Sequence, residues 1–457
     1  MKNINELSEA NIGRLMLKFF IPAFIGVFVN ALYNIVDRIF IGQGVSAEAL
    51  SGVSVIFPVM LIMMGFGMLI GIGTGVLVSI NLGRKDFKRA EKILGTGFFL
   101  IIIASILMTA FILLIKDPIL KSFGADKETY NYARDYLQII AGGTIFMMVG
   151  FSLNNVIRSE GNARLAMISM LISAGTNLIL DPVFIFWFGW GVKGAALATV
   201  ISMMILAVWV ILHFRSSRSV LKLRKENIRI DFTIMKEIVA IGMAPFSMQV
   251  AGSFVQGLLN KKLIFYGGNL AAGALGIINS IATLVIMSVV AINMASQPII
   301  GFNHGAQASE RVKETLRISL IAASIVSVVA FLIVQSIPGL LIKLFNHDNE
   351  VLYNITVTGL RTALLALPLV GFQVVSGHFF QAIGKSKVAA LLTLLRQVIV
   401  LIPLLYILPS LYSLRGIWIA FPIADVISAL IVSLFLAREW KRMAKIEEYE
   451  ETDEYPL

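Results

Sequence analysis

Two aspartates and an asparagine stand inside long apolar runs, where an ionisable side chain is costly. Asp37 lies late in one run, and Asp181 lies in another, four residues after Asn177 and directly before Pro182. Residues four apart share one face of a helix, and Pro182 has no N–H, which leaves a carbonyl one turn earlier without its helical partner. Carboxylate, amide and carbonyl oxygens suit a hard cation, or a carboxyl group that carries a proton.

Thr199, in the next apolar run, would add a hydroxyl to this set. A polar network that only locks helices together is the structural alternative. For Asp37 another alternative is an ion pair with Arg38, but adjacent helical residues point about 100° apart and do not face each other. Asp425 is a third acid in an apolar run, and here the sequence favours a structural pair with Arg396 of the preceding run.

The elements that hold these residues are those of an integral membrane protein. Of the 457 residues, 58% are hydrophobic and 14% are charged, whereas soluble domains average about 25% charged residues. The net charge of +11 comes from basic residues scattered between apolar runs, which is typical of cytoplasmic loops and argues against nucleic-acid binding. There are no cysteines, which excludes disulfides and thiolate metal sites.

Each apolar run supplies the roughly 20 residues that a helix needs to cross the hydrocarbon core. The predicted fold class is an all-α integral membrane protein with twelve transmembrane helices in two six-helix bundles. The runs lie at 16–42, 50–81, 92–115, 131–157, 163–188, 192–214, 234–265, 271–300, 315–342, 351–383, 387–410 and 414–438. The predicted parts are an N-terminal lobe (1–214), a basic cytoplasmic linker (215–233), a C-terminal lobe (234–438) and a cytoplasmic tail (439–457).

The two lobes resemble copies of one unit, because several matches recur in order at a shift of 222 or 223 residues. They are Pro22 with Pro245, Asn81 with Asn303, Gly161 with Gly384, and Gly194 with Gly416. An even number of spans makes the copies parallel, so they are pseudo-symmetric about an axis along the membrane normal. Secondary transporters are commonly built from such repeats, with the substrate held between them.

The basic segments 83–92, 215–229 and 438–445 fall on one side of a twelve-span arrangement. They predict a multi-pass protein of the cytoplasmic membrane with both termini in the cytoplasm. The N-terminus is interpreted as a short cytoplasmic lead, not a cleaved signal. No GxxxxGK[ST], HExxH or GxSxG motif occurs, so no built-in ATPase, catalytic set or cofactor is predicted. Energy for pumping would come from an ion gradient.

Several stretches resemble the multidrug and toxic compound extrusion (MATE) family of bacterial type. They are VDRIFIG (36–42), SEGN (159–162), the run 177–199 and QPIIGFNHGA (297–306). The resemblance covers nearly the whole chain and implies a V-shaped pair of bundles that exports drugs in exchange for Na⁺ or H⁺. It also implies an ion-coupling cluster of Asp37, Asn177, Asp181 and Thr199, with Tyr136 and Asn154 nearby. If the ion is Na⁺, the first four would be its ligands.

Some family members carry carboxylates in the middle of the seventh and tenth helices, whereas the middle of those spans here offers amides and a histidine, and Glu237 lies only at the start of the seventh. Coupling is therefore expected to rest on the N-terminal lobe. The residues expected to line a substrate cavity are Gln256, Asn260, Asn279, Met287, His378 and Gln381. The first helix is expected to bend near Pro22 or Gly26.

The prediction is a cation-coupled multidrug efflux antiporter, a secondary active transporter and not an enzyme. Its expected partners are amphipathic, often cationic drugs and the lipid bilayer, with the protein as a monomer. The alternative is a flippase for lipid-linked oligosaccharide or polysaccharide precursors, which would line its cavity with cations; Arg396 is the one mid-span candidate. An ion channel would need repeated filter residues and an intramembrane enzyme a catalytic set, and the sequence supplies neither.

Overall fold

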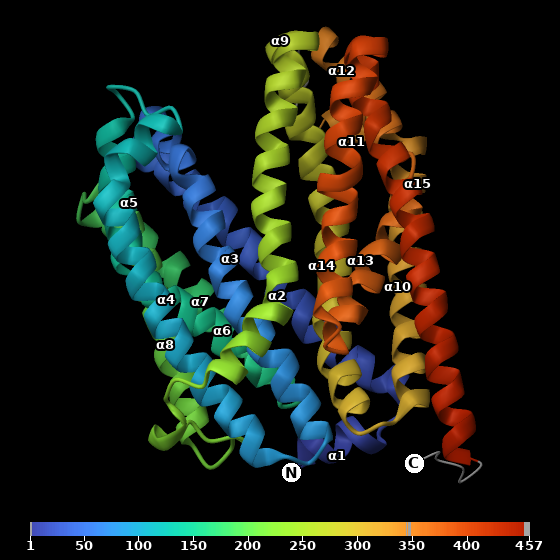
Figure 1. Ribbon diagram of the computed structural model, residues 1–457. Helices are drawn as coiled ribbons and strands as arrows, with labels where there is room; N and C mark the ends of the chain where they lie inside the picture. Colours follow the sequence, from blue (N-terminus) through green and yellow to red (C-terminus); the bar gives the residue numbers. More distant parts are fainter. Residues whose placement is uncertain (1, 344, 346–348, 452–457) are drawn as a thin grey trace. The chain divides into compact units, whose positions relative to one another are not determined.

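The computed structural model describes residues 2–343, 345 and 349–451, and every regular element in that part of the chain is helical (Figure 1). Eight helices are long and apolar enough to cross a membrane, and two bent helix pairs add two more spans. Two of the eight contain a break, at Gly268 in the first and Ser413 in the second. Each of these two counts as two spans, which gives twelve, and the predicted fold class is confirmed.

The chain forms two compact units, and each is described by itself. The N unit runs from Leu17 to Phe246 and includes the start of the chain up to Ala10. The C unit runs from Ser247 onward and includes Asn11–Met16. Residues 234–246, predicted to open the C-terminal lobe, therefore pack with the N unit.

The helices of the N unit surround a core that contains Ile41, Tyr136 and Ile185. Three helix starts are capped by a side-chain oxygen that accepts from a backbone N–H, at Ser46, Asp86 and Asn162, as short polar residues commonly do. The elements are α1 (Lys2–Glu9), α2 (Ile12–Gly44), α3 (Ala47–Gly83), α4 (Phe87–Ser122), α5 (Tyr130–Gly142), α6 (Thr144–Ser159), α7 (Ala163–Pro182), the π-helix η1 (Val183–Trp187), α8 (Gly191–Arg215) and η2 (Lys225–Asn227).

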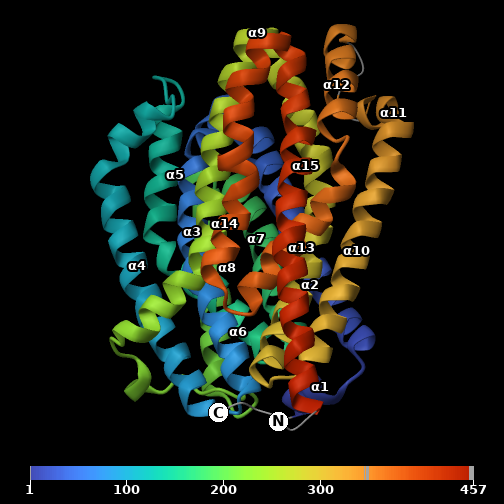
Figure 2. The ribbon, with the colours of Figure 1, turned by 45° about the vertical axis from the view of Figure 1, so that its right-hand side comes forward.

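The C unit packs around the buried Trp418. Its α13 contacts both α10 and α15, and the three run side by side (Figure 2). The elements are α9 (Phe232–Gly305), which starts in the N unit and reverses near Gly268, α10 (Ser309–Ser336), α11 (Pro338–Lys343), α12 (Glu350–Ala363), α13 (Leu367–Ala382), α14 (Ser386–Leu394), the π-helix η3 (Leu395–Leu401) and α15 (Ile402–Glu451).

The backbone repeats its irregular features in both units. The α5–α6 and α12–α13 pairs each bend by 53°. Left-handed residues recur at the shift of the sequence matches: Lys85 with Gln307, Gly161 with Gly384, and Gly191 with Ser413. Kinks and left-handed turns depend on backbone geometry and not on hydrophobicity, so their recurrence supports a duplicated six-helix unit.

The start of α9 lies against α3 through two glycines. A Cβ on Gly242 would lie 1.7 Å from the carbonyl oxygen of Leu69, and a Cβ on Gly73 would lie 2.2 Å from that of Ile238. Only residues without side chains allow two helix backbones to approach so closely. The linker before α9 is also held, since Glu91 accepts from the backbone N of Lys222 and pairs with Arg224.

Candidate ion-coupling site

Five helices of the N unit carry the predicted coupling residues. Asp37 lies on α2, Tyr136 on α5, Asn154 on α6, Asn177 and Asp181 on α7, and Thr199 on α8. Directly after Pro182 the chain changes from α-helix to the π-helix η1. Proline breaks the regular hydrogen bonding of a helix, and single π-helical turns are frequent at functional sites.

The structure brings the core of the predicted cluster together. Asn177 Nδ2 lies 3.2 Å from Asp181 Oδ1 and 3.4 Å from Thr199 Oγ1. The side chains of Asp37 and Asp181 contact each other, although they are 144 positions apart in the chain. Asp37 is 9% exposed and Asp181 is 1% exposed, so two carboxyl groups share one buried site.

Three oxygens of this cluster have no hydrogen-bond donor among the described residues. They are Asp37 Oδ1, Asn177 Oδ1 and Asp181 Oδ2, and all three are buried. A buried polar oxygen without a partner is destabilising unless something else satisfies it. Carboxylate and amide oxygens are ligands for hard cations, and a proton shared between the carboxyl groups would also satisfy two of them.

A tyrosine that the sequence reasoning missed joins the site. Tyr33 lies one helical turn before Asp37 on α2, and both Asp37 and Asp181 act on it electrostatically. Tyr136, which was predicted, is 2% exposed and contacts the Thr199 side chain. The signal for Tyr33 was its four-residue spacing from Asp37, which places the two on one helix face.

Asn154 belongs to a different network of the N unit. Its Oδ1 accepts from Arg158 at 2.9 Å, and its Nδ2 donates to Ser169 Oγ at 2.8 Å and to the Ala166 carbonyl at 2.9 Å. The amide nitrogen of Asn154 therefore binds α7 at a point two to three helical turns before Asn177. No described contact joins Asn154 to Asp37 or Asp181.

Arg38 packs against an aromatic ring of α3. Its guanidinium lies 5.0 Å from the ring centre of Phe57 on α3, and among the described residues it forms no salt bridge with Asp37. The two hinge candidates lie within the unbroken helix α2, where Pro22 is an interior residue. A Cβ on Gly26 would lie 3.0 Å from the Met170 sulfur on α7.

The predicted cavity residues all lie in the C unit. Asn279 Nδ2 donates to Gln256 Oε1 at 3.3 Å, so the structure brings these two amides together. Gln256 and Asn260 are exposed, Met287 and His378 are half-buried, and Gln381 is buried.

The predicted pair of Arg396 and Asp425 is confirmed as a salt bridge between η3 and α15. Gln373 on α13 donates to the backbone oxygen of Asp425 at 2.9 Å. In the part of the chain that the structure describes, no three histidine, aspartate or glutamate side chains cluster as metal ligands. The Asp37 site holds two carboxylates, an amide and a hydroxyl.

Known proteins share this architecture. The MATE multidrug transporter DinF-BH is 37% identical, with 93% of this chain and 95% of that chain covered and a TM-score of 0.87. A multidrug resistance MATE family transporter of the MOP superfamily, in its outward-facing conformation, has the same fold, with a TM-score of 0.90 at 24% identity over 97% of this chain and 99% of that chain. The multidrug export protein MepA of Staphylococcus haemolyticus is 28% identical over 423 residues, 93% of each chain.

The model of the MatE family matches residues 22–183 and 245–407, one stretch in each half of the chain. The first stretch contains Asp37, Asn177 and Asp181. This protein is a multi-pass membrane protein that belongs to the MatE family, whose members are secondary transporters and not enzymes.

Proposed function

We propose that this protein is a cation-coupled multidrug exporter of the cytoplasmic membrane, with both termini in the cytoplasm. The buried pair of Asp37 and Asp181 carries the proposal. Two carboxylates that face each other repel, so binding of a proton or Na⁺ between them relieves a like-charge cost. The pair therefore binds a cation without help from any basic side chain.

Coupling requires that the ion and the drug each bind the two transport states differently. In the outward-facing state the cation enters the Asp37–Asp181 pair, and neutralisation lets α2 bend near Pro22 or Gly26 and displaces the drug. The ion then leaves on the cytoplasmic side. An inward-negative membrane potential favours its entry by about 2.3 kcal/mol per charge per 100 mV.

Both coupling ions remain compatible with these oxygens. Na⁺ would use Asp37 Oδ1, Asn177 Oδ1 and Asp181 Oδ2, the three atoms without donors, with Thr199 Oγ1 beside them. H⁺ needs only the two carboxyl groups. The choice decides whether Asn177 contributes a ligand or only a hydrogen bond to Asp181.

The proposed substrates are amphipathic, often cationic compounds. The names of the relatives support a drug-like class, since MepA is a multidrug export protein and DinF-BH is a multidrug transporter. In the C unit, the exposed amides of Gln256 and Asn260 offer neutral polar contacts within an apolar bundle. The lipid-precursor flippase is the less favoured interpretation, because the salt bridge with Asp425 neutralises Arg396.

Ethidium export from proteoliposomes tests the proposal, with a Na⁺ gradient and a pH gradient imposed separately. We expect export under one gradient in the wild type, and at least a tenfold loss in both Asp37→Asn and Asp181→Asn. Asp135→Asn is the matched control, since this aspartate pairs with Lys193 and Arg134. Unimpaired export by both coupling-site variants would overturn the mechanism, and no export by the wild type under either gradient would overturn the function.

A further inference from the structure

A row of polar side chains runs along one face of α7 from the coupling site. Ser169, Ser173, Asn177 and Asp181 are spaced four apart, so they share a helix face. Ser173 Oγ donates to the Ser202 carbonyl at 3.2 Å, and Ser169 is fully buried. The row spans about 18 Å along the helix axis. We call these four residues the α7 stripe.

The end of the α7 stripe farthest from Asp181 meets a buried arginine. Asn154 connects the two, since its Nδ2 donates to Ser169 Oγ at 2.8 Å and its Oδ1 accepts from Arg158 Nη2 at 2.9 Å. Arg158 Nη1 donates to Asn155 Oδ1 at 3.1 Å. Arg158 is 6% exposed, so a full positive charge is buried where the stripe ends.

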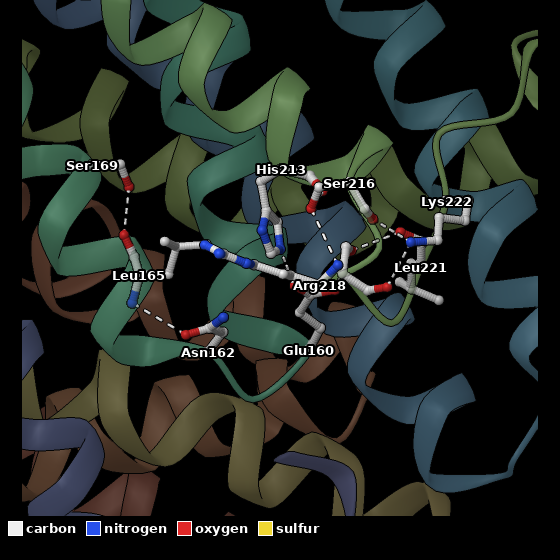
Figure 3. Close-up of polar contacts among 10 residues, drawn as sticks. Glu160, Asn162, Leu165, Ser169, His213, Ser216, Arg218, Leu221 and Lys222 are labelled. Carbon is white, nitrogen blue, oxygen red and sulfur yellow. Dashed lines mark hydrogen bonds and ion pairs between the residues drawn. The ribbon is translucent and has the colours of Figure 1, made fainter. Parts of the chain in front are cut away.

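No described carboxylate neutralises Arg158, because both of its contacts are side-chain amides. The acid closest in sequence is Glu160, which is itself buried. One carboxylate oxygen of Glu160 contacts His213 (Figure 3), and the other accepts from Ser219 Oγ at 2.8 Å. A buried charge without a counter-ion is destabilising and marks a functional candidate inside a membrane bundle.

The C unit supplies an internal comparison. At the shift of 223 residues that relates Gly161 to Gly384, the position of Arg158 is held by the neutral Gln381. The positions of the α7 stripe are held by Leu392, Arg396, Val400 and Leu404. Three of these are aliphatic, and Arg396 is tied to Asp425. The unpaired arginine therefore occurs in the repeat whose stripe is polar and leads to the carboxylate pair.

We propose that Arg158 is an electrostatic plug, which stops the coupling cation from leaking out of the Asp37–Asp181 pair along the α7 stripe. The inference rests on the proposed function. Buried hydroxyl and amide groups can be hydrated and so offer a cation a route through a bundle, whereas a fixed arginine charge on such a route excludes cations. Without the plug, ions would cross without drug, and the gradient would be lost without transport.

A drug-free leak assay tests the plug. Proteoliposomes carry a trapped pH-sensitive or Na⁺-sensitive dye, and a K⁺ diffusion potential drives the cation inward at equal pH on both sides. We expect the cation to enter proteoliposomes with Arg158→Gln at least tenfold faster than those with the wild type. Arg158→Lys keeps the charge, so the cation should enter at the wild-type rate. Arg164→Gln is the matched control, because Arg164 is an exposed arginine at the start of α7.

Two further variants separate a lost plug from a damaged bundle. A leak through the stripe starts at the coupling pair, so it should fall to the wild-type rate in the double variant Arg158→Gln/Asp181→Asn, whereas a leak through a disordered bundle would persist. Arg158→His should leak less at low pH than at high pH, since only the protonated imidazole carries the charge. Any of three outcomes would overturn the plug. They are a wild-type leak rate in Arg158→Gln, a leak in Arg158→Lys equal to that of Arg158→Gln, and a leak that persists in Arg158→Gln/Asp181→Asn. Since no drug is present, these outcomes are independent of whether the wild type exports ethidium.

Discussion

Gly191 and Ser413, 222 residues apart, both have a positive backbone φ, of 53° and 51°. Gly191 opens α8 in the N unit, and Ser413 interrupts α15 in the C unit. Each residue lets the chain re-enter the membrane for the last span of its six-helix unit. A left-handed conformation costs a residue with a side chain about 1 to 2 kcal/mol, so the C unit keeps the turn despite a less suitable residue.

Exchanging the residue types at these two turns should change stability in opposite directions. Gly191→Ser should lower the unfolding free energy by about 1 kcal/mol, because a Cβ there meets only Val45, at 3.5 Å, and backbone strain is the main cost. Ser413→Gly should be neutral or stabilising. Thermal unfolding in detergent measures both. Gly276→Ser, at a helical glycine with open space around it, is the control, and an equal loss there would show that the left-handed turn is not the cause.

The number of spans and the duplication could be predicted from sequence because apolar run length and repeated glycines are local signals. The boundary between the two units could not. Residues 234–246 begin an ordinary apolar run, and nothing in its periodicity indicates that Gly242 lies against the Leu69 carbonyl of α3. Close backbone contact between distant helices depends on the fold, so a run of the right length was assigned to the wrong neighbours.

The contact of Gly242 with α3 predicts that even a methyl group there is destabilising. In Gly242→Ala the new Cβ would overlap the Leu69 carbonyl, so the start of α9 must move away from α3, at a cost of about 1 to 3 kcal/mol. Gly257→Ala on the same helix is the matched control, since nothing lies within 4 Å of its Cβ position, and its better helix propensity should stabilise by up to about 1 kcal/mol. Similar thermal midpoints for the two variants would contradict this packing.

The coupling site was predictable in part. The spacing of Asn177 and Asp181 already places both on one helix face, but no spacing relates Asp37 on α2 to Asp181 on α7, and that association came from the family resemblance. Tyr33 was missed although its four-residue spacing from Asp37 places the two on one helix face, because a tyrosine in an apolar run resembles an ordinary packing residue. The resemblance placed Asn154 near the coupling cluster, and only the fold determines that it binds Arg158 and Ser169.

Asn177→Ala should weaken the binding of the coupling ion without abolishing it. The substitution removes the donor to Asp181 and Thr199 and one of the three oxygens without a partner. We expect the ion concentration for half-maximal export to rise about tenfold, which corresponds to about 1.4 kcal/mol. Titration of ethidium export against Na⁺ or pH measures it. The neighbouring Thr176→Ala is the control, and an unchanged midpoint in Asn177→Ala would remove Asn177 from the site.

Removing one partner of the Arg396–Asp425 salt bridge should destabilise the C unit by more than the intact pair stabilises it. Asp425 is 2% exposed, so Arg396→Met leaves a buried carboxylate without its partner. Because the Arg396 side chain is 32% exposed, water can reach the site, and we expect a loss of about 2 kcal/mol, below the roughly 3 to 5 kcal/mol typical of fully buried pairs.

Replacing both partners removes the unpaired charge, so the double variant Arg396→Met/Asp425→Leu should recover most of the stability lost in Arg396→Met. A double-mutant cycle on thermal or denaturant unfolding in detergent gives the coupling energy between the two positions. Losses that simply add would mean that the two charges do not stabilise each other. Recovery together with retained ethidium export would place the pair among the structural contacts of the C unit, separate from the coupling carboxylates of the N unit.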